Sequence, residues 1–166
     1  EKVSPFITGG GMINEVFEDH ATWAELPDKF EAGTPNVAGA VGLASAIEYL
    51  EKLGLESVRE HDQQIVEYAL AQLGQAKNIT VFGPKDAEIR SGCVSFEYKG
   101  VHAHDVATIL DSEGVAVRSG HHCTMPLHKS LGLSASIRAS FNVYTTTRDI
   151  DSLVKALGKV KQVFGK

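Results

Sequence analysis

Residues 93–98 alternate strictly between apolar side chains and other types. Val94, Phe96 and Tyr98 fall on one face of an extended chain, and the residues between them fall on the opposite face. A period of two residues with one apolar face predicts a strand that is buried on one side only. Residues 136–141 show the same alternation, so we expect both segments to belong to a sheet with one covered face.

Amphipathic helices are expected to cover that face. In residues 102–113 the apolar side chains recur at intervals of three and four residues, and Gly114 follows as a stop signal. A second such helix starts near Thr146 and carries the last apolar stripe of the chain. Shorter strands are expected at residues 79–82 and 115–117. This order of strands and helices predicts an α+β fold in which helices pack against a sheet.

The N-terminal third has a different character. Scattered apolar residues in 12–30 predict short strands or a hairpin, with Trp23 as an interface or packing anchor. A hydroxyl at Thr34 followed by Pro35 is typical of a helix start. The apolar residues that follow cover more than one helical face, so they predict a largely buried helix that ends before Gly54.

The start of this helix admits two interpretations. Exposed amide groups and the positive end of the helix dipole can bind an anion, with Gly33 allowing close approach and Thr34 adding a hydroxyl. The alternative is a well-capped helix without a ligand. A further helix is expected to begin at a capping box formed by Ser57 and Glu60.

The composition limits the classes of protein to which the chain can belong. With 166 residues, 43% of them hydrophobic, it is long enough for one substantial core, or for one core and part of another. A formal net charge of −5 without a basic cluster argues against binding to nucleic acid. No apolar run approaches the roughly 18 to 20 residues that cross a bilayer, so we expect no membrane contact and a cytoplasmic protein.

The chain has two cysteines, Cys93 and Cys123. Two thiols do not make a disulfide framework in a chain of this size, and unpaired thiols fit a reducing compartment. Cys93 falls within an alternating strand and is interpreted as structural. The first residues, EKVSP, include no initiator methionine, and we expect the chain to be a piece of a longer protein.

The second cysteine lies in residues 118–126, which have the sequence RSGHHCTMP. A thiol is a nucleophile only as the thiolate, which nearby cationic or proton-accepting groups favour. Arg118, His121 and His122 are such groups, so one hypothesis is a reactive thiol at Cys123 on a mobile loop. A structural loop with incidental polar residues is the second hypothesis. A zinc site that recruits further histidines is the third, but adjacent ligands rarely share one tetrahedral ion.

The same stretch, extended by one leucine, resembles a family signature. RSGHHCTMPL is similar to the RxGHHCAMPL motif of the group II cysteine desulfurases, the SufS-type, selenocysteine lyase-like branch of the class V aminotransferases. One departure is Thr124, where the family usually has alanine, and we expect it to tune the loop without disabling it. Supporting matches follow the family's order: GGGMI at 9–13, FEAGTPN at 30–36, AIEYL at 46–50, HAHDV at 102–106 and RAS at 138–140.

The resemblance implies removal of sulfur from L-cysteine with pyridoxal 5′-phosphate as cofactor, leaving L-alanine and a persulfide on an enzyme cysteine. Cys123 matches that cysteine. Arg138 matches the arginine that holds the substrate α-carboxylate, for which the bidentate guanidinium fork is suited. Gly33 and Thr34 match positions that reach the cofactor phosphate of the other subunit in a homodimer. No metal belongs to the implied site. The other residues of the implied active-site loop are Arg118, His121 and His122.

The resemblance also implies how the chain is divided. Residues 55–166 are expected to form the C-terminal small domain, an antiparallel-rich sheet with helices packed on it. Residues 1–54 are expected to be a remnant of the large domain, with a hairpin and an interdomain helix. The family's Schiff-base lysine lies upstream, and no lysine of this chain sits in a matching context, so the chain alone is expected to be inactive. The implied partners are L-cysteine or L-selenocysteine, a second subunit and a sulfur-acceptor protein for iron–sulfur cluster assembly.

Two other functions are compatible with these residues. One is a selenocysteine lyase of the same fold, which the motifs do not separate from a desulfurase. The other is a binding module, an isolated domain that carries or receives persulfide sulfur through Cys123 without the cofactor.

Overall fold

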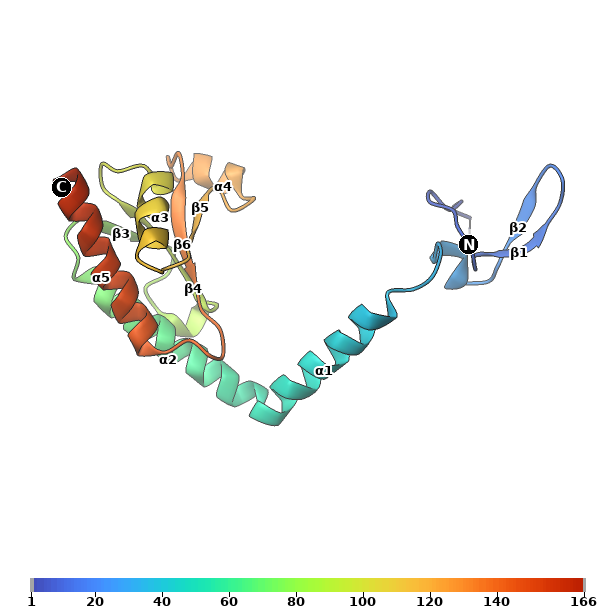
Figure 1. The fold of residues 1–166 in the computed structure, drawn as a ribbon, viewed down its shortest axis with the longest axis horizontal. Helices are drawn as coiled ribbons and strands as arrows, with labels where there is room; N and C mark the ends of the chain where they lie inside the picture. The colour runs from blue at the N-terminus through green and yellow to red at the C-terminus, as the bar shows by residue number, and fades with distance from the viewer. Residues whose placement is uncertain (1, 166) are drawn as a thin grey trace. The chain divides into compact units, whose positions relative to one another are not determined.

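The computed structural model describes residues 2–165. The chain divides into two compact units, Glu1–Lys52 and Leu53–Lys166. Figure 1 shows the order of the helices and strands along both units. None of the helices in the described range combines the length and the apolar character that crossing a membrane requires.

The N-terminal unit is built on a hairpin. Its strands pair antiparallel, with Ile13 opposite Trp23, so the predicted hairpin is confirmed. Met12, at the base of the hairpin, is fully buried. The glycine-rich segment before it is held by a backbone hydrogen bond of 2.8 Å from the Gly33 amide to the Gly10 carbonyl. The elements of this unit are β1 (Ile13–Val16), β2 (Ala21–Trp23), the 3-10 helix η1 (Asp28–Phe30) and α1 (Val37–Leu53), whose last residue falls in the second unit.

Helix α1 begins later than its sequence suggests. The side-chain oxygen of Asn36 accepts a hydrogen bond of 2.9 Å from the Gly39 amide, which is the bond that an N-cap residue makes to the third helical position. The first helical residue is therefore Val37. The predicted start at Thr34 and Pro35 is wrong, because a second capping side chain follows them and lies within reach of the free amides.

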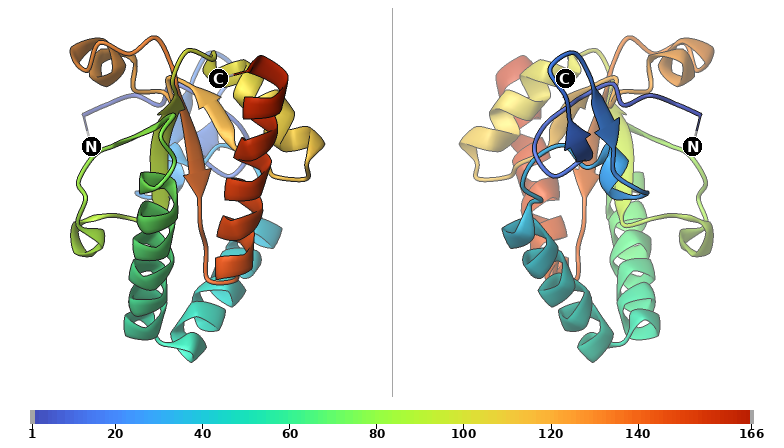
Figure 2. Two further views of the ribbon diagram at one scale, coloured as in Figure 1. Left: turned by 90° about the vertical axis from the view of Figure 1, so that its left-hand side faces the viewer. Right: turned by 90° about the vertical axis from the view of Figure 1, so that its right-hand side faces the viewer.

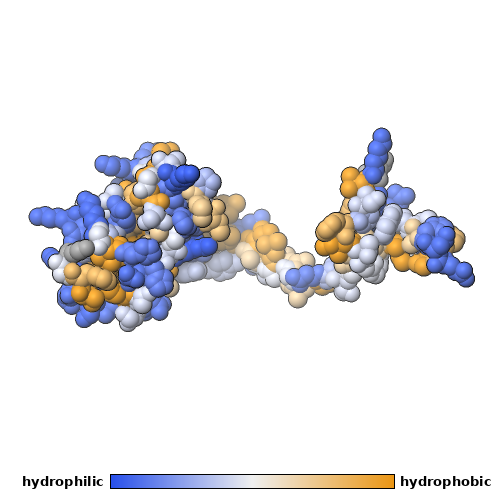
Figure 3. Space-filling model, turned by 90° about the horizontal axis from the view of Figure 1, so that it is seen from above, coloured by the Kyte–Doolittle hydropathy of each residue, from blue (hydrophilic) through white to orange (hydrophobic). Residues whose placement is uncertain are grey.

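Burial of α1 is also predicted wrongly. The helix has no buried residue, and Val37, Val41 and Leu43 are each more than 60% exposed. Apolar side chains are visible on the surface of the N-terminal unit in Figure 3. An apolar pattern states which faces a helix can bury, but burial also needs a second surface, and no other element of residues 2–52 supplies one for α1.

The C-terminal unit is a four-stranded antiparallel sheet with helices on one face, in the strand order β3-β4-β6-β5 (Figure 2). Helices α2, α3 and α5 pack on the same face. The predicted α+β fold is therefore confirmed. The strands are β3 (Ile79–Phe82), β4 (Cys93–Tyr98), β5 (Arg118–Gly120) and β6 (Ser136–Ser140). The helices are α2 (Leu55–Gly74), η2 (Ala87–Ile89), α3 (Ala103–Ser112), α4 (Met125–Ser130) and α5 (Thr147–Phe164).

The core of this unit lies between the sheet and helices α2, α3 and α5. On β4, Val94, Phe96 and Tyr98 are buried and the residues between them are not, and on β6 the side chains of Ile137 and Ala139 enter the same core. The alternation predicted for both strands is confirmed. The helices contribute the stripes that their periods predict, with Val106 and Leu110 from α3 and Ile150, Leu153, Leu157 and Val160 from α5.

Two boundaries differ from the predictions. Helix α2 starts at Leu55, directly after Gly54, which has φ of 83° and makes no side-chain cap, so the predicted capping box at Ser57 lies inside the helix and is wrong. Residues 115–117 are not a strand. The Val115 amide donates to the Leu110 carbonyl at 2.9 Å, a bond of the helix C-terminus, so sheet pairing begins only at β5. The predicted start of α5 is confirmed, since Thr146 forms a capping box.

Candidate active site

The face of the sheet opposite the helices carries a row of polar side chains. Because Ile137 points into the core, its neighbours Ser136 and Arg138 point to the opposite face. Arg138 pairs with Ser95 on β4 and with Arg118 on β5, and directly opposed residues of neighbouring strands share a face. Two of the predicted site residues, Arg118 and Arg138, are therefore brought side by side by the register of the sheet.

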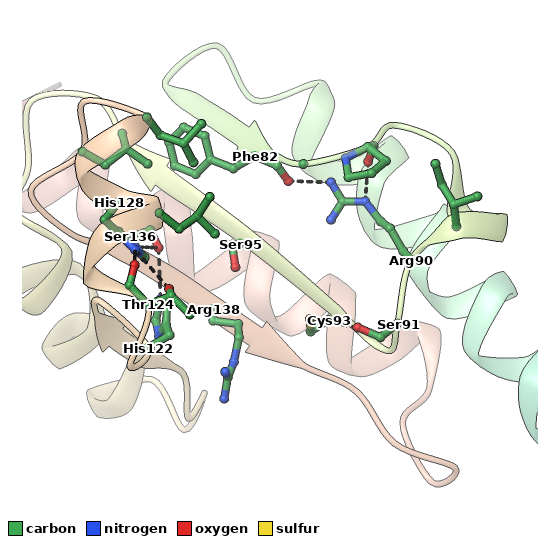
Figure 4. A pocket seen from close by; sticks show the side chains of 16 residues that line it. Phe82, Arg90, Ser91, Cys93, Ser95, His122, Thr124, His128, Ser136 and Arg138 are labelled. Atoms are coloured by element: carbon green, nitrogen blue, oxygen red, sulfur yellow. Dashed lines mark hydrogen bonds between the residues drawn. The ribbon is translucent and has the colours of Figure 1, made fainter.

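A cavity of about 530 Å³ lies over this face of the C-terminal unit. Figure 4 shows a polar group at one end of it, formed by His122, Thr124, His128 and Ser136, and Arg90 at the other end. Of the predicted site residues, His122 and Arg138 line the cavity. Its volume is within the range of cavities that hold small molecules.

Cys123 lies in a tight turn between β5 and α4. The Thr124 amide donates to the His121 carbonyl at 2.8 Å and closes the turn. Its two central residues, His122 and Cys123, have φ of 51° and 61°, the signs of a type I′ turn. Such turns normally contain Gly, Asn or Asp, because each side chain in the left-handed region costs roughly 1 to 2 kcal/mol. Residues with backbone strain of this kind are concentrated at functional sites.

The thiol of Cys123 is free and exposed, and it lies beside a cation. The Nη2 group of Arg118 donates a hydrogen bond to the Cys123 sulfur at 3.7 Å. Cys93 is also a free thiol, but it is only partly exposed, on β4. Its sulfur lies 3.6 Å from the Ser91 hydroxyl.

Beneath the turn, one buried hydroxyl joins two imidazoles. The Ser136 Oγ lies 3.0 Å from His122 Nε2 and 2.9 Å from His128 Nε2. Burial first, and then electrostatic interactions with Arg138, His128 and Arg118, lower the pKa of His122, and a backbone hydrogen bond with Ser136 offsets them only in part, so the neutral imidazole is favoured at pH 7. The role of Ser136 was not predicted, although its position two residues before Arg138 on an alternating strand placed both on one face.

Three further histidines, His102, His104 and His121, have partners close to them in the chain. His102 is the N-cap of α3, where its Nδ1 accepts a bond of 3.2 Å from the His104 amide, and His104 lies 3.6 Å from an Asp105 oxygen. His121 packs edge-on against His128, with 5.5 Å between the ring centres. Within residues 2–165, no three His, Cys, Asp or Glu side chains form a group that could hold a metal ion.

Gly33 and Thr34 lie in the N-terminal unit, in the loop before α1. Gly33 has φ of 85°, and a side chain built there would meet no atom within 4 Å, so the backbone is open on that side. Thr34 is exposed, and its hydroxyl has no hydrogen-bond partner within the described part of the chain. An open backbone and a free hydroxyl fit one edge of a phosphate group.

Comparison with known proteins agrees with this fold and these motifs. The family model described as aminotransferase class-V matches residues 1–153. This match spans most of the chain, so the chain belongs to the class V aminotransferase family.

Relatives within that family include proteins named as cysteine desulfurases. A probable cysteine desulfurase of Halalkalibacterium halodurans is 49% identical over 99% of this chain and 40% of its own length. Among solved structures, the cysteine desulfurase CsdA of Escherichia coli is 36% identical with a TM-score of 0.85, covering 96% of this chain and 39% of that one. The enzyme of Thermococcus onnurineus is 38% identical with a TM-score of 0.87, over 96% and 40%. The resemblance to cysteine desulfurases of the class V aminotransferase family is confirmed, and the chain spans about two fifths of the relatives that it matches.

Proposed function

We propose that this chain is the C-terminal part of a cysteine desulfurase that depends on pyridoxal 5′-phosphate and forms its persulfide on Cys123. The observation that carries the proposal is the exposed Cys123 thiol, held in a strained turn 3.7 Å from Arg118. In this proposal residues 55–166 are the small domain and residues 1–54 belong to the large domain. The sulfur supplies iron–sulfur cluster assembly through an acceptor protein.

The chain's own residues account for two parts of the reaction. Arg138 receives the α-carboxylate of L-cysteine through its two parallel donors. The Cys123 thiolate attacks the substrate sulfur, so that an S–S bond forms while the C–S bond of the substrate breaks. The electron pair of the broken bond stays with the carbon, which takes up a proton to become L-alanine. Enzyme thiol and cysteine thus give persulfide and alanine, and no external oxidant or reductant is needed.

The cofactor supplies, when bound, the electron sink that lets the substrate C–S bond break. Gly33 and Thr34 would contact its phosphate from the neighbouring subunit of a homodimer, through the open backbone and the free hydroxyl. Its Schiff-base lysine would come from the part of the enzyme that precedes this chain.

The test uses the complete enzyme and two matched cysteine variants. With L-cysteine and no reductant, we expect Cys123→Ser to lose alanine formation and Cys93→Ser to keep it, because the Cys123 thiol is exposed on the turn whereas Cys93 is only partly exposed on β4. Mass spectrometry of the enzyme should find 32 mass units, one sulfur atom, added to the peptide that contains Cys123. Persulfide on Cys93, or full activity of Cys123→Ser, would refute the proposal.

A second pair of variants tests Arg138. A hydrogen-bonded charge contributes about 1.5 to 3 kcal/mol, so Arg138→Gln should raise KM for L-cysteine by roughly ten- to a hundredfold. Arg148→Gln makes the same chemical change on an exposed turn of α5 and should leave KM unaltered. Equal KM values for the two variants would remove Arg138 from the substrate site.

A further inference from the structure

The turn that carries Cys123 rests on a largely buried chain of hydrogen bonds, whose direction follows from which of its atoms can only accept. Ser136 and His128 are 2% and 5% exposed, so water does not replace their partners. Both are joined to the turn, Ser136 through His122 and His128 through Thr124. Figure 4 shows these four side chains together at one end of the cavity.

The direction begins at Thr124. Its hydroxyl donates its only hydrogen to the His121 carbonyl at 2.7 Å. His128 Nδ1 lies 3.3 Å from that hydroxyl oxygen and 3.2 Å from the Thr124 carbonyl oxygen, and both can only accept. Nδ1 therefore carries the hydrogen of His128, and in the neutral ring Nε2 is left as an acceptor.

The direction then passes through Ser136. Because His128 Nε2 is an acceptor, the Ser136 hydroxyl donates its hydrogen to that nitrogen at 2.9 Å. The Ser136 oxygen can then only accept from His122, whose Nε2 lies 3.0 Å away and must carry the hydrogen. Neutral His122 is thus left with a bare Nδ1, and this atom is buried without a hydrogen-bond partner within residues 2–165.

The same bonds hold both ends of the strained turn. His122 is the first of the two residues in the left-handed region, and Thr124 is the residue that closes the turn. His122 bonds to Ser136 directly and Thr124 does so through His128, and Ser136 lies on a central strand of the sheet. A strained backbone persists only where several surrounding contacts hold it in place, as they do here. We propose that Ser136 and His128 are positioning residues, which hold His122 as its Nε2–H tautomer and thereby hold the turn that presents the Cys123 thiol. The effect on catalysis rests on the proposed function, whereas the tautomer does not.

Protonation of His122 would break this arrangement. The added hydrogen would sit on Nδ1, which is buried without a hydrogen-bond partner within residues 2–165. The charges that face the ring are cationic, Arg118 from β5, Arg138 from β6 and His128 from α4 when it is protonated, and a backbone hydrogen bond with Ser136 opposes them only in part, since the pKa of His122 is lowered. The direction of the hydrogen bonds and the charge around the ring therefore favour the same neutral form.

The first test reads the tautomers directly. In the protein labelled with ¹⁵N at histidine, long-range ¹H–¹⁵N spectra at pH 7 distinguish a ring nitrogen that carries hydrogen from one that does not. We expect hydrogen on Nε2 of His122 and on Nδ1 of His128, which are opposite tautomers. Hydrogen on Nδ1 of His122 would overturn the proposal, whatever the activity of the enzyme.

The second test uses the complete enzyme with Ser136→Ala and Ser136→Thr. Loss of the hydroxyl should lower the rate of persulfide formation on the order of ten- to a hundredfold by displacing the thiol, with KM for L-cysteine changed less than threefold. Ser136→Thr keeps the hydroxyl and should restore most of the rate. In Ser136→Ala the His122 signals should show both tautomers, a change that a loss of packing alone would not produce.

The control and the contrary outcomes are separate from those of the proposed function. Ser130→Ala removes an exposed hydroxyl that bonds only within α4, and its rate should equal that of the unaltered enzyme. A rate for Ser136→Ala within twofold of Ser130→Ala would overturn the positioning role. Failure of the desulfurase proposal would appear instead as unaltered activity of Cys123→Ser.

Discussion

Strand β6 allows a test of whether the residues that stabilise the fold and the residues of the candidate site lie on opposite faces of the sheet. Ile137 is fully buried between Ser136 and Arg138, which face the cavity. Ile137→Ala removes three carbon atoms, which at about 0.8 kcal/mol each is about 2.4 kcal/mol of transfer free energy. The cavity left behind adds to this, so we expect a loss of about 3 to 4 kcal/mol in the free energy of unfolding.

Urea unfolding of the 166-residue protein, followed by circular dichroism, measures this loss. At slopes of about 1 to 3 kcal/mol per molar urea, the midpoint should fall by at least about 1 M. Ile137→Val removes one carbon and should cost about 1 kcal/mol, and Ile89→Ala, at a site that is 69% exposed, should stay within about 0.5 kcal/mol. If Ile137→Ala costs no more than Ile89→Ala, the assignment of faces to β6 is wrong.

Two further predictions concern helix starts. Asn36→Ala should cost about 1 kcal/mol in local stability of α1, seen as faster amide hydrogen exchange at Gly39, whereas Thr34→Ala should leave that exchange rate unaltered. Thr146→Ala should lower the stability of the C-terminal unit by about 1 kcal/mol in urea unfolding. The backbone amide of Thr146 and, to a lesser extent, its hydroxyl donate hydrogen bonds to the Asp149 carboxylate and lower its pKa. This carboxylate therefore stabilises the fold above its ordinary pKa of 3.8, and the contribution is lost as pH falls through the lowered value. Acid unfolding of Asp149→Asn should lack that component.

The elements that could be predicted from the sequence are those with a strong local period. The alternation of residues 93–98 and the stripe of α3 are confirmed because one continuous core covers them. Helix starts were less predictable, since Thr34 and Asn36 can both cap a helix and local preferences between them differ little. Burial of α1 could not be predicted from its own residues, because it depends on a second surface.

In the candidate site, too, contacts within a short motif could be predicted from the sequence, whereas contacts between strands could not. Arg118 and Cys123 are five residues apart, and their proximity was predicted from the motif and is observed at 3.7 Å. The contact between His122 and Ser136 spans fourteen residues and depends on the register in which β5 pairs with β6. A period of two residues fixes which face a side chain occupies, but not which residue of the next strand lies opposite, so this contact needed the structure.

The register of β5 and β6 has a cost that the fold itself does not explain. It sets Arg118 directly opposite Arg138, and like charges in that relation are destabilising. Neither guanidinium forms an ion pair with a carboxylate within residues 2–165, and Arg138 is held only by a bond of 3.1 Å to the Ser140 hydroxyl. An anionic group in the cavity would relieve the repulsion, and L-cysteine carries such a group. Since Ile137 stabilises β6 from its other face, the β5–β6 pair can tolerate two opposed cations where the proposed substrate binds.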